Sequence, residues 1–150
     1  MVYGSPGLAI LGVGSRALWR GERMALFWWI CLGGAIGTGA RYALSGWLLK
    51  ALGASFPYGT LAVNVLGSFL VGSVMYAGLE AGMIPPTLRV ALATGVLGGF
   101  TTYSSFSYET LRYIQEGAWL VAALNLAATF LGCLAACFLG WTGARWLLAP

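Results

Sequence analysis

The fold is decided by the stretch Gly98-Gly99-Phe100-Thr101-Thr102-Tyr103-Ser104-Ser105-Phe106-Ser107. It lies within an apolar segment that begins near Leu88 and is long enough to predict a membrane-spanning helix. Adjacent glycines weaken a helix by about 1 kcal/mol each relative to Ala, and Ser and Thr side chains compete for backbone hydrogen bonds. We therefore expect this helix to be broken in mid-membrane. Such a break is tolerated only where it is buried in protein or lines an aqueous or ionic cavity, which predicts an ion-handling centre.

The composition is that of a small membrane protein. The chain has 150 residues, of which 59% are hydrophobic and 8% are charged, whereas soluble domains carry about 25% charged residues. At about 20 apolar residues per crossing, this length accommodates four spans joined by short turns. The sequence thus predicts an all-α membrane protein with four transmembrane helices, the third of them broken. Four short helices bury little surface against one another, so we expect an obligate oligomer.

The charged residues separate the hydrophobic runs. Eight Lys and Arg face four Glu, and His is absent. A nucleic-acid-binding protein would gather its cations on one face, but here they lie between apolar runs, as topology signals do. Lack of His removes the commonest general base, so an enzyme is not expected. The three Cys lie in apolar segments and are interpreted as small buried hydrophobic residues, without a disulfide.

The chain divides into a leader and a membrane domain. Residues 1–23 form a Gly-rich leader that we expect to be disordered or untranslated, because Met24 directly precedes the first long apolar run. Residues 24–150 form the transmembrane domain. Its predicted spans cover about residues 25–49, 58–79, 88–113 and 119–148.

Several polar residues fall inside these spans. Arg41 either snorkels towards the interface or has a structural or electrostatic role near the ion route. Glu109 lies towards the far end of span three. Two polar stripes recur at four-residue spacing, which places their members on one helix face; each serves interhelical hydrogen bonding or ion contact. The stripes are Thr60, Asn64 and Ser68 in span two, and Asn125, Thr129 and Cys133 in span four.

The cations are balanced across the membrane. From Met24 onward, and leaving aside Arg41 inside its span, Arg89 and Arg145 fall on one side and Lys50 and Arg112 on the other. A Lys/Arg imbalance normally sets the orientation. A balanced chain can insert both ways, which predicts an antiparallel, dual-topology homodimer.

Three ordered segments resemble the CrcB/Fluc family of fluoride channels. They are residues 33–42, GGAIGTGARY; residues 56–72, FPYGTLAVNVLGSFLVG; and residues 95–109, GVLGGFTTYSSFSYE. The resemblance covers residues 24–146 and implies an antiparallel homodimer with two fluoride pathways lined by both subunits. It also implies a structural sodium ion at the dimer centre.

The resemblance also implies roles for individual residues. The sodium ion would be held by the backbone carbonyls of Gly98 and Thr101. Two positions depart from the family pattern: Tyr103 replaces a usual Phe, and Asn125 replaces a larger polar residue. The implied fluoride pathway comprises Asn64, Thr102, Tyr103, Ser104, Ser105, Phe106, Asn125 and Thr129.

The expected function is passive, fluoride-selective export across the inner membrane, which protects the cell from fluoride toxicity. The expected partners are fluoride, sodium, a second copy of the chain and the lipid bilayer. The alternative is a small multidrug-type proton antiporter, which is also a four-span dimer. That mechanism needs a membrane-embedded carboxylate, and the four Glu lie near predicted turns.

Overall fold

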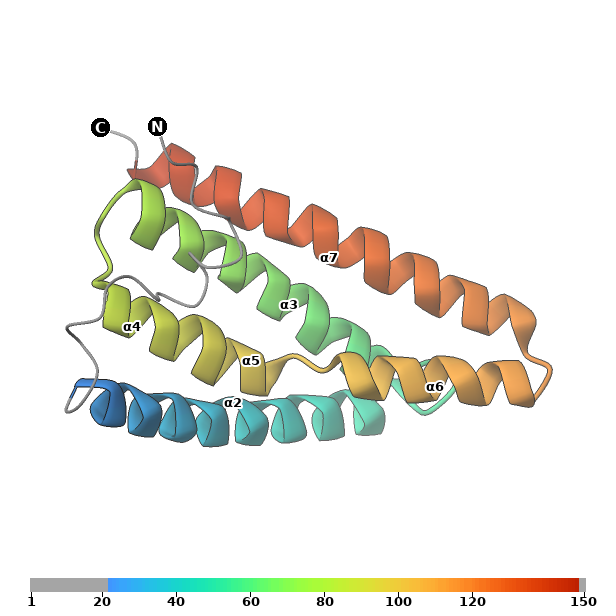
Figure 1. Cartoon of the computed structure of the whole chain (residues 1–150). Coiled ribbons are helices and arrows are strands. Elements are labelled where there is room, and N and C mark those ends of the chain that lie inside the picture. The colour runs from blue at the N-terminus through green and yellow to red at the C-terminus, as the bar shows by residue number, and fades with distance from the viewer. Residues whose placement is uncertain (1–21, 149–150) are drawn as a thin grey trace, which may run out of the picture.

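The computed structural model describes residues 22–148, and every element in this part of the chain is helical. The chain reverses direction at each turn between its long helical passes, so that consecutive passes run back along the molecule (Figure 1). The predicted break is present, and we call the interrupted stretch between Pro86 and Gln115 the broken run. The elements are α2 (Glu22–Leu52), α3 (Tyr58–Met75), the π-helical turn η2 (Tyr76–Glu80), α4 (Pro86–Val90), the π-helical turn η3 (Ala91–Leu97), α5 (Gly98–Phe100), α6 (Tyr103–Gln115) and α7 (Trp119–Leu148).

The predicted spans match these helices to within a few residues at each end. The helices are joined by short turns, and Gly53 and Gly117 adopt φ values of 77° and 74° there, which only glycine tolerates without strain. The predicted leader lies outside the described residues, apart from Glu22 and Arg23, which begin α2.

Helices α3 and α7 pack along most of their length (Figure 1). A Cβ atom at Gly72 would overlap the Cys137 carbonyl, and one at Gly140 would overlap the Phe69 carbonyl. The backbones can therefore meet only because both residues are glycine, the close approach typical of membrane helices. Ser73 Oγ adds a hydrogen bond of 3.1 Å to the Gly140 carbonyl.

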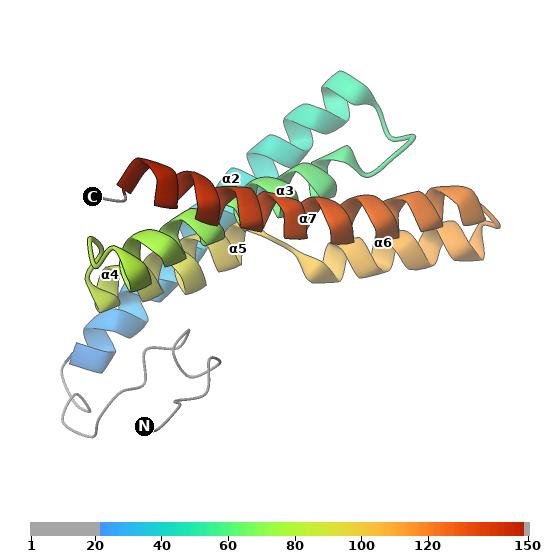
Figure 2. The same ribbon diagram turned by 90° about the horizontal axis from the view of Figure 1, so that it is seen from above.

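Helix α2 packs in the same way against the first half of the broken run. A Cβ atom at Gly37 would overlap the Val96 carbonyl, one at Gly95 would lie 2.9 Å from the Ile30 carbonyl, and one at Gly99 would lie 2.5 Å from the Gly34 carbonyl. The C-terminal part of α2 then diverges from α6 (Figure 2). The first half of the broken run is thus docked on α2, and the second half, α6, packs on α7.

Arg89 fixes the start of the broken run. Its side chain is buried, and a terminal guanidinium nitrogen donates a hydrogen bond of 3.3 Å to the carbonyl of Gly78 in η2. A side chain at position 78 would crowd the Arg89 stem, since a Cβ atom there would lie 2.7 Å from its Cδ. The guanidinium therefore ties α4 to the end of the preceding helix.

The single chain buries a small core and exposes large apolar side chains on all its long helices. Its buried hydrophobic residues are Val63, Val90, Leu97, Phe106, Ala122 and Ala136. Within residues 22–148, two helical stretches are long and apolar enough to cross a membrane by length and composition, Tyr58–Glu80 and Trp119–Leu148. Exposed apolar surface of this extent marks contact with lipid or with another chain.

Candidate ion site at the helix break

The break consists of two extended residues. Thr101 has φ −82° and ψ 159°, and Thr102 has φ −151° and ψ 106°, so the chain leaves α5 and re-enters a helix at Tyr103. Thr102 is the N-cap of α6, and its hydroxyl accepts a hydrogen bond of 3.2 Å from the Ser105 amide. A Thr cap satisfies one of the free amides at the start of a helix. The local sequence therefore both ends α5 and starts α6.

Asn64 of α3 stabilises the break through hydrogen bonds to the backbone of Thr102. Its Oδ1 accepts a hydrogen bond of 2.7 Å from the Thr102 amide, and its Nδ2 donates one of 3.1 Å to the Thr102 carbonyl. The Asn64 side chain is 8% exposed. A carboxamide carries both a donor and an acceptor, so one buried side chain satisfies both backbone groups of the extended residue. This is the interhelical role that its position in the polar stripe allowed.

These contacts deprive two carbonyls of their normal partners. In a continuous helix, the amides of Thr102 and Ser105 would donate to the carbonyls of Gly98 and Thr101. Here the Thr102 amide donates to Asn64, and the Ser105 amide donates to the Thr102 hydroxyl. The carbonyls of Gly98 and Thr101, which are predicted to hold sodium, are therefore among those released from helical pairing at the break.

Hydroxyl groups cluster at the start of α6. The Thr102 hydroxyl lies 2.9 Å from Ser105 Oγ and 3.3 Å from Ser104 Oγ. Thr102 is buried, Ser105 is half-buried and Ser104 is exposed. The three predicted hydroxyls therefore meet, with the Thr102 hydroxyl bonded to both serines, and none of these residues lines the pocket described next.

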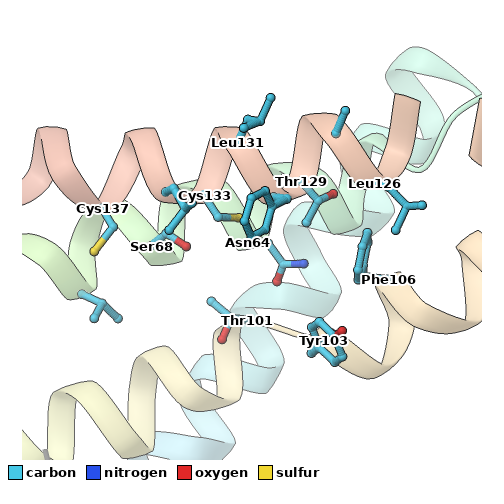
Figure 3. A pocket seen from close by; sticks show the side chains of 14 residues that line it. Asn64, Ser68, Thr101, Tyr103, Phe106, Leu126, Thr129, Leu131, Cys133 and Cys137 are labelled. Atoms are coloured by element: carbon cyan, nitrogen blue, oxygen red, sulfur yellow. The ribbon is translucent and has the colours of Figure 1, made fainter. Parts of the chain in front are cut away.

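A pocket of about 960 Å³ opens beside the break, between α3, α6 and α7 (Figure 3). Predicted site residues from three elements meet there: Asn64 from α3, Tyr103 and Phe106 from α6, and Thr129 from α7. Most of the remaining lining is apolar. The full lining is Asn64, Ser68, Val71, Thr101, Tyr103, Phe106, Leu126, Ala127, Thr129, Phe130, Leu131, Cys133, Leu134 and Cys137.

The two predicted pathway aromatics differ in exposure. Phe106 is 7% exposed and points into the pocket near Asn64, whereas Tyr103 is 80% exposed at its edge (Figure 3). Their ring centroids lie 5.5 Å apart at an interplanar angle of 52°. A ring edge carries partial positive charge, so this pair can offer edges to an anion. The exposed Tyr103 ring is free to contact a second chain.

The polar stripe predicted in span four, which is α7, lies partly in the pocket and partly in the core. Thr129 lines the pocket, but Asn125 is fully buried and does not. Asn125 Nδ2 donates a hydrogen bond of 2.9 Å to the hydroxyl of Thr110 on α6, which sequence reasoning did not single out. Asn125 Oδ1 accepts a longer bond, 3.5 Å, from Thr129. In the single chain, Asn125 therefore links α7 to α6 and positions Thr129.

The two charged residues predicted near the route lie outside the pocket. Glu109 on α6 is half-buried and accepts a hydrogen bond of 2.7 Å from Thr60, while its Oε2 is buried without a partner among the described residues. It lies within α6, six residues before the helix ends at Gln115. Arg41 is half-exposed on α2.

Ser68 and Cys137 line the pocket but were not predicted as pathway residues. The spacing of both residues in the sequence could have identified them. Ser68 is the third member of the α3 stripe, and Cys137 continues the α7 stripe by one further turn after Cys133. Four-residue spacing on a helix places such residues on one face.

Comparison with known proteins gives a consistent match. The family model described as CrcB-like protein, Camphor Resistance (CrcB), matches residues 28–141. A protein of Anaeromyxobacter dehalogenans named fluoride-specific ion channel FluC is 56% identical over 124 residues, which cover 83% of this chain and 98% of that protein. Relatives with the same name in Sorangium cellulosum and Geobacter metallireducens are 52% and 50% identical, over 84% and 79% of this chain and 99% and 95% of their own lengths.

The matched region contains the whole of the break, Asn64 and all the pocket-lining residues. Identity of this level over nearly the full length of the relatives shows common descent and a common fold. The chain belongs to the CrcB family.

Proposed function

We propose that this chain forms a fluoride-selective channel that exports fluoride passively down its electrochemical gradient and so protects the cell from fluoride toxicity. The observation that carries the proposal is the Asn64-stabilised break, which opens onto a pocket holding an amide, hydroxyls and aromatic rings. The relatives named fluoride-specific ion channel support the choice of anion. The protein is accordingly a transporter and not an enzyme.

The pocket chemistry suits a small, strongly hydrated anion. Ser68 and Thr129 line the pocket together with Asn64 and Phe106, whereas Thr101 lines it with its hydroxyl already donating a hydrogen bond of 3.0 Å to the Leu97 carbonyl. These groups replace part of a hydration shell with donors and partial positive charge. Conduction requires that the ion be released as well as bound. Because none of these groups carries a full charge, no single contact binds the ion too tightly to be released.

We propose that the released carbonyls of Gly98 and Thr101 hold a structural sodium ion. Hard cations prefer oxygen ligands, and carbonyl oxygens serve without a carboxylate. Within residues 22–148, no group of three or more His, Cys, Asp or Glu side chains gathers to bind a metal. The proposed site uses backbone carbonyls alone, and the ion would supply positive charge beside the anion route.

We further propose four spans in the inner membrane and an antiparallel, dual-topology homodimer. Helix α7 has 30 residues, and at 1.5 Å per residue it exceeds the roughly 30 Å hydrocarbon core of a bilayer. Exposed aromatic and aliphatic side chains on α2 and α7 leave much surface to be covered by lipid and by a second chain. The balanced cations support both orientations of insertion.

The family assignment does not support the proton antiporter alternative. An antiporter needs its carboxylate in the transport route, but Glu109, the carboxylate within α6, bonds to Thr60 and does not line the pocket. The other Glu residues within residues 22–148 are Glu22, Glu80 and Glu116, and each lies at or next to a helix end.

The test is fluoride release from proteoliposomes, followed with a fluoride electrode. A potassium ionophore is added so that potassium efflux dissipates the membrane potential that fluoride efflux would otherwise build up. The purified chain should release fluoride rapidly and without a proton gradient, while protein-free vesicles retain it. Absence of release, or release only when a proton gradient is imposed, would refute the proposal.

A further inference from the structure

Two free cysteines line the pocket beside the break. Cys133 and Cys137 are half-buried on α7, and their side chains border the same space as Asn64 and Ser68 (Figure 3). The third cysteine, Cys31, is exposed on α2 and does not line the pocket. The chain therefore contains a pair of thiols at the proposed anion route and a natural control thiol away from it.

The spacing of the pair suits a shared ligand. Residues four apart on a helix lie on one face, with Cβ atoms about 5–6 Å apart. Thiolate sulfur binds soft metal ions in preference to hard ones. A soft divalent ion entering the pocket can thus bond to both sulfurs without any movement of the helix backbone.

We propose that Cys133 and Cys137 form a binding site for a soft, thiophilic metal ion such as the mercuric ion, and that occupancy of this site blocks anion passage. Binding forms two metal–sulfur bonds and breaks two S–H bonds, and both protons pass to water in the pocket. No oxidation occurs. The two thiolates neutralise the charge of the divalent ion, so the product is a bulky, neutral plug.

The position of the pair explains the block. Thr129, Cys133 and Cys137 follow one another at single-turn intervals along the pocket wall of α7, with Asn64 and Ser68 on the α3 side. An ion bound to the two sulfurs therefore occupies the space beside the donors assigned to fluoride. This part of the inference rests on the proposed function, whereas metal binding itself does not.

Binding is measured first, on the detergent-solubilised protein with Cys31→Ser, by titration with mercuric chloride. Mercury–thiolate absorption in the near ultraviolet and proton release into weak buffer are followed together. We expect one mercuric ion per chain with two protons released, and no binding after Cys133→Ser and Cys137→Ser are added. Each single replacement should weaken binding by about tenfold or more, because one ligand is lost. Two ions per chain, or none, would overturn the shared site.

Block is measured next as fluoride release from proteoliposomes, with each variant normalised to its own metal-free rate. The unmodified chain and Cys31→Ser should lose most of their release in mercuric chloride and recover it with excess dithiothreitol. The variant with both Cys133→Ser and Cys137→Ser should resist. Equal block of that variant, or an unblocked wild type that still releases fluoride, would overturn the inference. Absence of release before metal is added would instead count against the proposed function, and the binding titration would still decide the site.

Discussion

Asn64 is the residue on which the break depends most. Its side chain supplies the partners that a continuous helix would have given to both backbone groups of Thr102. Each bond contributes about 0.5–1.5 kcal/mol net, and loss of one leaves a buried group unsatisfied. The same amide borders the pocket. One residue therefore serves both the structure of the break and the lining of the route.

We predict that Asn64→Asp abolishes fluoride release. The carboxylate keeps the acceptor for the Thr102 amide but loses the donor to the Thr102 carbonyl, and it places negative charge beside an anion route. A buried unpaired acceptor costs about 1–3 kcal/mol, so the thermal midpoint in detergent should also fall. Ser107→Ala is the control, because Ser107 is exposed on α6 and bonds only to its own helix. Wild-type release by Asn64→Asp would contradict this role.

At this scale, pattern reasoning predicted the break and the polar stripes that contain Asn64 and Thr129, whereas Phe106 was implied only by the family resemblance. Asn64, Phe106 and Thr129 come from distant parts of the chain and meet in one pocket. The sequence could not show that Asn125 bonds to Thr110 behind that pocket, because four-residue spacing assigns a face but not the rotation of that face about the helix axis. That rotation depends on packing against neighbours.

At the scale of elements, glycine contacts set the position of the broken run. Gly33 and Gly37 stand four residues apart in the sequence, which places them on one face of α2. The element that packs against this face could not be predicted. It is the backbone of η3 and α5, and a π-helical turn leaves no clear signal in the sequence. Such turns are frequent at functional sites. Here η3 directly precedes the carbonyls of the proposed sodium site.

Gly37→Ala should severely destabilise the protein, because its Cβ atom would overlap the Val96 carbonyl and force α2 away from the break. Overpacking of this kind costs about 1–3 kcal/mol or more, and displacement of α5 should also reduce fluoride release. Gly46→Ala on the same helix is the matched control, since no atom lies within 4 Å of its added Cβ. Thermal midpoints in detergent distinguish the pair. Equal midpoints would show that the contact is not limiting.

Sodium removal tests the proposed carbonyl site, because no side-chain substitution can delete a backbone carbonyl. Purification and reconstitution with N-methyl-D-glucamine in place of sodium should lower the thermal midpoint and the rate of fluoride release, because the carbonyls of Gly98 and Thr101 lose their cation. Sodium addition should restore both. Identical stability and release without sodium would count against the site.

At the scale of the whole molecule, the single chain leaves many large apolar side chains exposed. Its core is small, and Tyr103 stands 80% exposed beside the pocket. A second copy on this face would enclose the pocket and cover the ring. The composition predicted oligomerisation. The geometry of a dimer depends on how the surfaces of two copies fit together, so it cannot be derived from the sequence of one chain.

Dual topology predicts labelling from both sides of the membrane. In a variant with its three cysteines replaced by Ser, Ala54→Cys places one thiol in the turn after α2. A membrane-impermeant maleimide applied outside sealed cells should label about half of the chains, because balanced cations allow both orientations. The remainder should react only after permeabilisation. Complete or absent labelling from outside would establish a single orientation.

The central claim is that the break and its pocket conduct fluoride and exclude other halides. It is tested most directly by electrical recording of the reconstituted protein with fluoride on one side of a bilayer and an equal concentration of chloride on the other. We predict a current whose reversal potential follows the fluoride gradient and lies far from zero. A reversal potential near zero with a finite current would show that fluoride and chloride pass equally, and would contradict the claim.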